Sequence, residues 1–342
     1  MEEVTPIGSR KSDHIRINLE EDVQSRLTTG LEQYHFIHHA LPEINLQDVD
    51  AHASLFGKEL SAPLLISSMT GGTNQAAKIN RFLAEAAQET NIAMGIGSQR
   101  IAFEHPELAS TFQVRRFAPD ILLFANLGAI QLNYGYSIDD CRRAVEMVSA
   151  DALILHFNSL QEALQKEGQT QFEGLINKIE HICKVLTVPV IAKEVGWGFC
   201  KQDITLLANA GISAIDVAGA GGTSWSQVEM YRAENDTLHH LAASFSDWGI
   251  PTAEAIQNVT EVAPDLPVIA SGGLRNGVDI AKCLALGAQM AGMAGPFLKA
   301  ASQSIDEVLH LINLIKNELV ICMFSTASKT LDHLRQDKLL KT

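Results

Sequence analysis

The chain is poor in cysteine and in basic charge. Five cysteines occur in 342 residues, far apart and without a C-x-x-C pair. This spacing favours reduced thiols and indicates neither a disulfide framework nor a zinc knuckle. Twenty-six Lys and Arg residues stand against forty Asp and Glu residues, which gives a formal net charge of −14. Such a surface repels nucleic acid and anionic lipid, so we expect neither as a partner.

Long apolar runs are also missing. No stretch of eighteen uninterrupted apolar residues occurs, and the first twenty-three residues are polar where a signal peptide needs an apolar segment. We therefore expect a soluble, cytoplasmic protein. With 46% hydrophobic and 19% charged residues, the composition is that of a globular protein, and its length alone does not distinguish one large domain from two.

One unit recurs eight times after residue 60: a short apolar run that ends in Gly, Ser, Thr or Asn, followed by a segment of helical periodicity. Nearly continuous apolar strands that alternate with helices are typical of a parallel sheet covered by helices. Eight of them predict a closed (β/α)8 TIM barrel in the α/β class; the competing open, doubly wound sheet lacks its usual G-x-G-x-x-G turn here. The eight runs are Pro63–Ser68, Asn91–Gly97, Ile121–Gly128, Ala152–Asn158, Pro189–Gly196, Ala214–Gly221, Pro267–Gly273 and Met290–Gly295.

These runs divide the chain into an N-terminal extension, residues 1–60, and a barrel, residues 61–342. In the extension we expect a weakly helical piece at Leu19–Leu27 and a β segment near Ile44–Val49. Roughly forty-five residues separate the sixth and seventh runs, which is long for a plain loop, so this segment is expected to cover the mouth of the barrel.

Polar residues gather where the runs end, and in this fold the carboxyl ends of the strands carry the chemistry. Three late glycine turns, Gly219–Ser224, Ser271–Arg275 and Gly292–Gly295, offer backbone N–H groups for a phosphate. For any one of these turns, the need for a glycine at a positive φ explains the sequence as well as a bound phosphate does. Together the three turns favour a phosphorylated cofactor.

Two charged residues at strand ends suggest specific roles. Lys193 ends an apolar strand, and a buried Lys needs an anion or a lowered pKa. A salt bridge to Glu194 is the alternative, although neighbouring residues in a strand face opposite sides. Glu162, beside Gln161, can deliver one carboxylate to Mg²⁺, which fills its other positions with water and phosphate oxygens. Alternatively, Glu162 binds no metal and simply lies in the first turn of a helix, where the helix dipole favours a negative charge.

Cations are also concentrated near the N-terminus, in Arg10-Lys11-Ser12-Asp13-His14. With Arg100 and His156 they can form an anion clamp in an otherwise acidic protein. A solvated charge cluster is the usual meaning of such a run.

Nine motifs occur in one order along the chain, and with them it resembles type 2 isopentenyl-diphosphate Δ-isomerase, an FMN-dependent family, over essentially its full length. The motifs are R-K-x-D-H at Arg10–His14, S-M-T-G-G at Ser68–Gly72, G-S-Q-R at Gly97–Arg100, N-L-G-A at Asn126–Ala129, L-H-x-N-x-x-Q-E at Leu155–Glu162, K-E-V-G at Lys193–Gly196, G-A-G-G-T-S at Gly219–Ser224, W-G-I-P-T at Trp248–Thr252 and S-G-G-x-R at Ser271–Arg275.

The resemblance implies an isomerase that interconverts isopentenyl and dimethylallyl diphosphate, with reduced FMN as acid and base, NADPH as reductant and a homo-tetramer or homo-octamer as the assembly. Gln161 and Lys193 would be catalytic, and Glu162 would bind Mg²⁺. The residues implied around FMN are Ser68, Met69, Thr70, Ser98, Asn126, Lys193, Thr223, Gly272, Gly273, Arg275, Ala294 and Gly295. Those implied to face the diphosphate substrate are Arg10, Lys11, Ser98, Gln99, Arg100, His156, Asn158 and Gln161.

Two other functions stay open at this stage. An FMN-dependent 2-hydroxy-acid oxidase or dehydrogenase shares the late phosphate turns, but would want a catalytic His with a nearby Arg after the sixth strand, where this chain has Gly221-Gly222-Thr223-Ser224. A non-catalytic, flavin-binding barrel is the other alternative, and it gives no reason for the Gln161-Glu162 pair.

Overall fold

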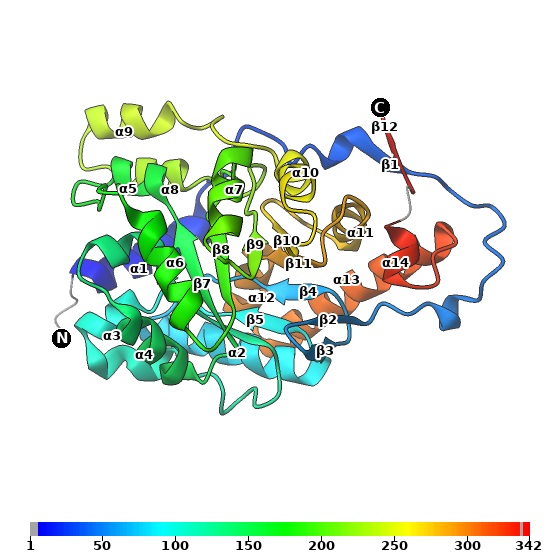
Figure 1. The fold of residues 1–342 in the computed structure, drawn as a ribbon, viewed down its shortest axis with the longest axis horizontal. Coiled ribbons are helices and arrows are strands. Elements are labelled where there is room, and N and C mark those ends of the chain that lie inside the picture. Colours follow the sequence, from blue (N-terminus) through cyan, green and yellow to red (C-terminus); the bar gives the residue numbers. More distant parts are fainter. Residues whose placement is uncertain (1–5, 336–337) are drawn as a thin grey trace.

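A computed structural model describes residues 6–335 and 338–342, with side chains from residue 11 onward (Figure 1). Eight parallel strands close into a barrel, and each lies inside one of the eight predicted runs, so the (β/α)8 prediction is confirmed. In barrel order the strands are β4 (Leu64–Ile66), β5 (Ala93–Gly95), β6 (Leu123–Gly128), β7 (Ala152–Phe157), β8 (Val190–Glu194), β9 (Ala214–Asp216), β10 (Val268–Ser271) and β11 (Met290–Met293).

Long helices form the outer layer of the barrel. They are α2 (Asn74–Thr90), α4 (Ile138–Val148), α6 (Leu175–Val185), α7 (Lys201–Asn209), α10 (Thr252–Val262), α11 (Gly277–Ala285), α12 (Gly295–Gln303) and α13 (Ile305–Ser325). Among the described residues α13 alone is long and apolar enough to cross a membrane. It packs against α2, α11 and α12 with one buried face, as an outer helix of a barrel does.

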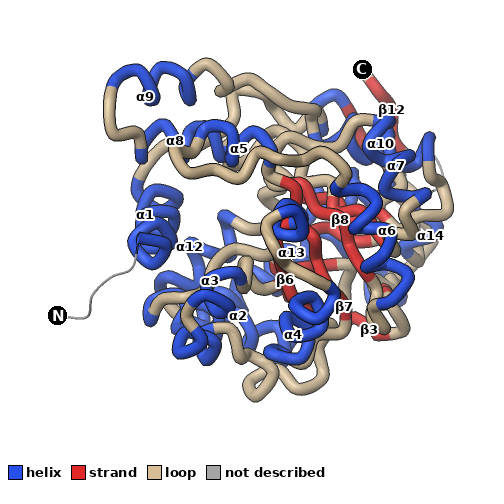
Figure 2. The backbone as a smooth tube through the Cα atoms, turned by 60° about the vertical axis from the view of Figure 1, so that its left-hand side comes forward, coloured by secondary structure: helices blue, strands red, loops and turns tan. Residues whose placement is uncertain are grey.

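Shorter elements connect these layers. They are α3 (Arg100–Glu104), α5 (Ser159–Leu164), α8 (Trp225–Arg232), α9 (Asp236–Ala243), α14 (Leu331–Leu334) and four 3-10 turns at Leu31–Gln33, Leu46–Asp48, Pro106–Thr111 and Ala129–Asn133. Figure 2 shows α8 beside α5, with α9 next to α8. The segment between the sixth and seventh barrel strands therefore contains three helices, α8 to α10, rather than a plain loop.

The N-terminal extension differs from the predicted elements. Its helix is α1 (Pro6–Glu20), not Leu19–Leu27, and a 3-10 turn replaces the β segment expected near Ile44–Val49. After α1 the chain runs along the turn that follows β9, where Ser25 N donates to Gly222 O over 2.8 Å. Farther along, β1 (Tyr34–Phe36) pairs with β12 (Leu339–Lys341). Backbone hydrogen bonds thus hold the extension at the mouth. Backbone hydrogen bonds do not depend on side-chain type, so the sequence pattern did not predict them.

A hairpin that the sequence analysis missed belongs to the opposite end of the barrel. Strands β2 (Ala53–Leu55) and β3 (Lys58–Leu60) pair antiparallel, and their Leu55 and Leu60 join the apolar cluster of the barrel interior. Phe56, in the hairpin turn, packs edge to face on Phe124 of β6, with ring centroids 6.4 Å apart. The hairpin therefore covers the amino ends of the strands with apolar side chains.

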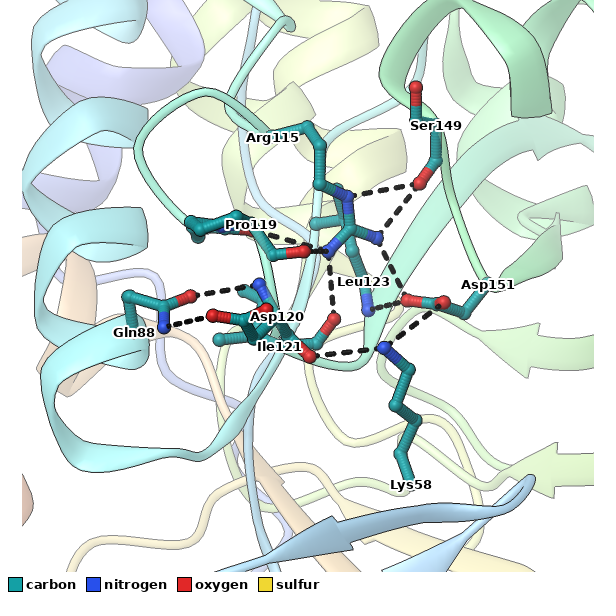
Figure 3. Close-up of polar contacts among 10 residues, drawn as sticks. Lys58, Gln88, Arg115, Pro119, Asp120, Ile121, Leu123, Ser149 and Asp151 are labelled. Atoms are coloured by element: carbon teal, nitrogen blue, oxygen red, sulfur yellow. Dashed lines mark hydrogen bonds and ion pairs between the residues drawn. The ribbon is translucent and has the colours of Figure 1, made fainter.

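Arg115 ties several loops together at this same end (Figure 3). Its guanidinium donates to the carbonyl oxygens of Ala118, Ile121 and Ser149, and to Asp151 Oδ2 at 2.8 Å. Lys58 of the hairpin lies 3.7 Å from the other oxygen of Asp151. We call Arg115, Asp151 and Lys58 the amino-end cluster; it closes the barrel bottom with polar groups that satisfy one another.

Candidate functional site

A change from apolar to polar side chains inside the barrel marks the floor of the candidate site. Each strand contributes one apolar side chain to the barrel interior; these are Leu65, Ala93, Phe124, Ile154, Ile191, Ala214, Ile269 and Met290. Side chains two positions apart in a strand share a face. The residue two positions after each of these therefore lies in the next layer toward the carboxyl ends. We call this next set the polar layer: Ser67, Gly95, Asn126, His156, Lys193, Asp216, Ser271 and Gly292.

Lys193 finds its anion within the polar layer. Its Nζ lies 3.5 Å from Oδ2 of Asp216, the residue paired with it in register on β9, and donates to Glu194 O at 2.9 Å. The Glu194 carboxylate instead accepts N–H bonds from the following loop, for example from Gly196 at 2.7 Å. Burial raises the pKa of Glu194 to about 7, although these hydrogen bonds act to lower it. The alternative of a Lys193–Glu194 salt bridge is therefore wrong, and Asp216 is a site residue that the sequence analysis missed.

His156, the register partner of Lys193 on β7, does not add a cation to the site. Its Nδ1 lies 2.8 Å from Asn126 Oδ1 and donates to it, because an amide oxygen only accepts. Burial, followed by the positive charges of Lys193 and Lys11, lowers the pKa of His156 to about 4. The expected anion clamp therefore contains a neutral imidazole at pH 7, which offers hydrogen bonds rather than charge.

Four buried polar side chains form a network just beyond the end of β7. Asn158 Nδ2 donates to Glu162 Oε1 at 2.9 Å, and it also lies 3.2 Å from Gln161 Oε1. Gln161 Nε2 donates to Glu229 Oε1 at 2.9 Å. The second oxygen of Glu162 accepts the N–H of Gln169. All four side chains are less than a tenth exposed, and we call them the amide–carboxylate network.

Glu229, on α8, is the second residue of the site that sequence reasoning missed. Burial raises its pKa, but hydrogen bonds from His14 and Gln161 and the charge of Arg232 outweigh burial and hold the pKa at about 2. It is therefore ionised at every working pH. The only sequence signal was its place in the long segment expected to cover the mouth, which does not single out one side chain.

The predicted cations reach the same region from two directions. Lys11 of α1 donates to Ser98 O at 2.8 Å, so the extension meets the loop that follows β5. Arg100 bonds Glu104 and lies 3.5 Å from Gln169 Oε1. The side chain of Arg10, also predicted here, lies outside the described residues.

Gln99 is used differently from the prediction. It is 0% exposed, its Nε2 donates to Ala144 O at 2.8 Å and its Oε1 accepts the N–H of Asn126. Both ends of the amide thus hold the end of β6 against α4. Because the side chain also has no exposed surface, Gln99 is a structural residue at this site and not a substrate contact.

The late glycine turns pack against one another. Gly272 and Gly273 have φ of +105° and +76°, and a Cβ on Gly273 would lie 2.4 Å from Gly221 O. The turns after β9 and β10 therefore need glycine for close backbone approach as well as for φ. Next to β10, α12 begins at Gly295 without a side-chain cap, and Ala294, Gly295 and Arg275 are exposed. An uncapped helix start suits a phosphate, and the exposed Arg275 is a further cation on the late turns.

Other predicted cofactor residues follow the carboxyl ends of barrel strands. Ser67 Oγ and Ser68 Oγ are buried without a hydrogen-bond partner, and Thr223 Oγ1 donates to Asn18 of α1 over 3.3 Å. Met69 and Thr70 follow β4, and Ser98 follows β5. Buried hydroxyls without partners are costly in a finished core, so they fit a polar ring system that would sit above the layer.

Comparison with known proteins points to one family. Residues 139–341 match the family model described as FMN-dependent dehydrogenase. A protein of Nostoc sp. named isopentenyl-diphosphate delta-isomerase is 55% identical, over 96% of this chain and 94% of the relative. The chain belongs to the isopentenyl-diphosphate delta-isomerase family. A Rickettsia africae protein of the same name is 50% identical, with 95% of each chain covered. The resemblance drawn from the nine motifs is thereby confirmed.

Solved structures show the same fold at much lower identity. A flavocytochrome b2 mutant superposes with a TM-score of 0.70 at 18% identity and covers 96% of this chain and 82% of its own. A mandelate oxidase mutant gives 0.67 at 18% identity, over 99% and 100%. At this identity the likeness concerns the barrel alone, and it carries no activity to this member of the isomerase family.

Proposed function

We propose that this chain interconverts isopentenyl diphosphate and dimethylallyl diphosphate in isoprenoid biosynthesis, with reduced FMN, Mg²⁺ and NADPH, as a cytoplasmic homo-tetramer or homo-octamer. The observation that carries the reaction is the amide–carboxylate network of Asn158, Gln161, Glu162 and Glu229, buried beside the polar layer. A barrel that binds flavin but does not isomerise a diphosphate substrate has no need for a buried amide–carboxylate network at its mouth.

The polar layer and the late turns would hold the cofactor. The turn Gly272–Gly273, Arg275 and the start of α12 at Ala294 and Gly295 would hold its phosphate, and Lys193, Asn126 and the serine hydroxyls would contact its ring. When bound, reduced FMN supplies acid and base for moving a proton between two carbons without net electron transfer. The Lys193 ammonium would stabilise negative charge on the ring, and Met69, Thr70, Ser98 and Thr223 would complete the enclosure.

Gln161 would orient the carbon skeleton of the substrate. Ionised Glu229 accepts from its Nε2, and Asn158 donates toward its Oε1, so both ends of the amide are fixed in one orientation. An amide stays neutral at every working pH. Gln161 can therefore present a constant surface to the substrate while the proton moves elsewhere.

Cations and one metal ion would hold the diphosphate. Lys11, Arg100 and Arg10 supply charge, while Ser98, Asn158 and the neutral His156 supply hydrogen bonds. Within the described part of the chain no three His, Cys, Asp or Glu side chains come together as a metal site. Glu162 as a lone carboxylate suits Mg²⁺, which keeps waters and takes substrate phosphate oxygens. Binding the non-reacting diphosphate in this way positions the alkene.

One anaerobic assay tests the proposal. The protein with FMN, Mg²⁺, NADPH and isopentenyl diphosphate should yield dimethylallyl diphosphate, and omission of NADPH should suppress the product. Full turnover with strictly oxidised flavin would refute the acid–base role of reduced FMN. Lactate or glycolate with oxygen uptake tests the oxidase alternative, for which the turn Gly221–Ser224 provides no histidine.

A further inference from the structure

Asp216 is a fully buried carboxylate that the proposed reaction does not use. It is 0% exposed and lies in the polar layer, where its Oδ1 accepts from Ser271 Oγ at 2.5 Å. Its Oδ2 has no hydrogen-bond donor and faces Lys193 Nζ at 3.5 Å. A buried carboxylate is strongly disfavoured unless a charge of opposite sign compensates it. Lys193 is therefore its charge partner, and Ser271 fixes its orientation.

The pairing restricts what Lys193 can do. An ammonium has three donors; one of them bonds Glu194 O and the side toward β9 faces Asp216. One donor remains for a ligand, and the Lys193 side chain keeps 10% of its surface exposed. The carboxylate thus both aims the ammonium and balances part of its charge from within the barrel.

We propose that Asp216 is a positioning residue that directs Lys193 toward FMN and limits how strongly Lys193 stabilises the reduced cofactor. This inference rests on the proposed function. Without the carboxylate, an uncompensated positive charge would face the ring and favour its anionic, reduced form. Reduced FMN stabilised in this way is less basic and accepts the substrate proton less readily.

The test replaces Asp216 with Asn, which keeps the shape and removes the charge. In the FMN-loaded D216N protein we expect the preference for reduced over oxidised FMN to rise about tenfold, which is about 30 mV in the midpoint potential of a two-electron couple. We also expect kcat to fall about tenfold while KM for isopentenyl diphosphate stays unchanged, because the diphosphate contacts lie on other elements. In a Lys193→Met background the same substitution should leave the potential unchanged.

Two further variants complete the experiment. Asp151→Asn removes a partly buried carboxylate at the amino end of the barrel, away from the proposed cofactor site, and should leave the potential unchanged. Ser271→Ala leaves the charge of Asp216 but frees it to approach Lys193, so the potential should fall; this variant decides the matter if D216N does not fold.

The outcomes separate the two proposals. An unchanged or lowered potential in D216N, or an equal shift with and without Lys193, would overturn the role of Asp216 while the wild type still binds FMN and isomerises. A wild type that binds no FMN would overturn the proposed function and this inference together.

Discussion

The two ends of the barrel differ in how completely their polar groups are satisfied by one another. At the amino end, Arg115 donates from all three of its nitrogens to carbonyl or carboxylate oxygens, and the apolar hairpin β2–β3 covers the strands. At the carboxyl end, buried polar atoms remain without a hydrogen-bond partner, among them Ser67 Oγ, Ser68 Oγ, Asn158 Oδ1 and Asp216 Oδ2. The first end is finished by the chain itself, whereas the second fits completion by a ligand.

This difference indicates where stability and activity separate in the molecule. In barrels of this type the amino face serves stability and the carboxyl face serves chemistry. Buried unsatisfied groups cost free energy in the unliganded protein, so the carboxyl end should gain stability from its cofactor. Substitutions at the two ends should therefore affect different measurements.

The largest expected effect is on activity, from Glu162→Gln at the carboxyl end. The substitution removes the one carboxylate proposed for Mg²⁺ but keeps an oxygen for Asn158 or Gln169. We expect kcat/KM to fall about 10²- to 10³-fold, which is about 3 to 4 kcal/mol of transition-state stabilisation, and half-saturation by Mg²⁺ to move to higher concentration. Steady-state rates across a magnesium titration measure both.

The control for this variant is Glu167→Gln, an exposed carboxylate five residues farther along the chain, which should change neither quantity. FMN affinity should be the same in wild type and both variants. An unchanged magnesium response in Glu162→Gln would exclude Glu162 as a ligand.

The next largest effect is on stability, from Arg115→Met at the amino end. The substitution leaves the carbonyls of Ala118, Ile121 and Ser149 and the Asp151 carboxylate without their shared donor. Unpaired acceptors of buried residues, here Ala118 and Ile121, are costly. We expect the free energy of unfolding to fall by about 2 to 3 kcal/mol, measured by urea denaturation, with kcat/KM of the folded protein unchanged. The neighbouring, exposed Arg116→Met should cost less than about 1 kcal/mol. A loss of activity larger than the loss of folded protein would contradict the separation of the two ends.

Sequence reasoning found the barrel because eight apolar runs repeat, but it could not assign which face of each strand points inward. Strands buried on both faces carry no alternation, so Asp216, in the run A-I-D-V-A-G, was not recognised as an interior residue, and Ser68 was named without Ser67. Glu229 was missed because it comes from α8, whose contact with α5 is tertiary. The motifs located Lys193, Gln161 and Glu162 because each lies at the end of a strand or in the short helix that follows one, where position along the chain fixes position in the fold.

The smallest expected effect concerns His156 and pH. Its pKa is about 4 in the folded protein and near 6.5 in an unfolded chain. Between these two pH values the imidazole is protonated in the unfolded state and neutral in the folded state. Stability of the apoprotein should therefore decrease as pH falls from about 6.5 to about 4, and His156→Gln should remove this contribution, about 1 to 2 kcal/mol after allowance for partial exposure. Urea denaturation of both proteins at several pH values measures it. Above pH 6.5 the difference in unfolding free energy between the two proteins should not depend on pH. If that difference also stays constant down to pH 4, His156 takes up its proton as readily in the folded protein as in the unfolded chain, and the prediction is wrong.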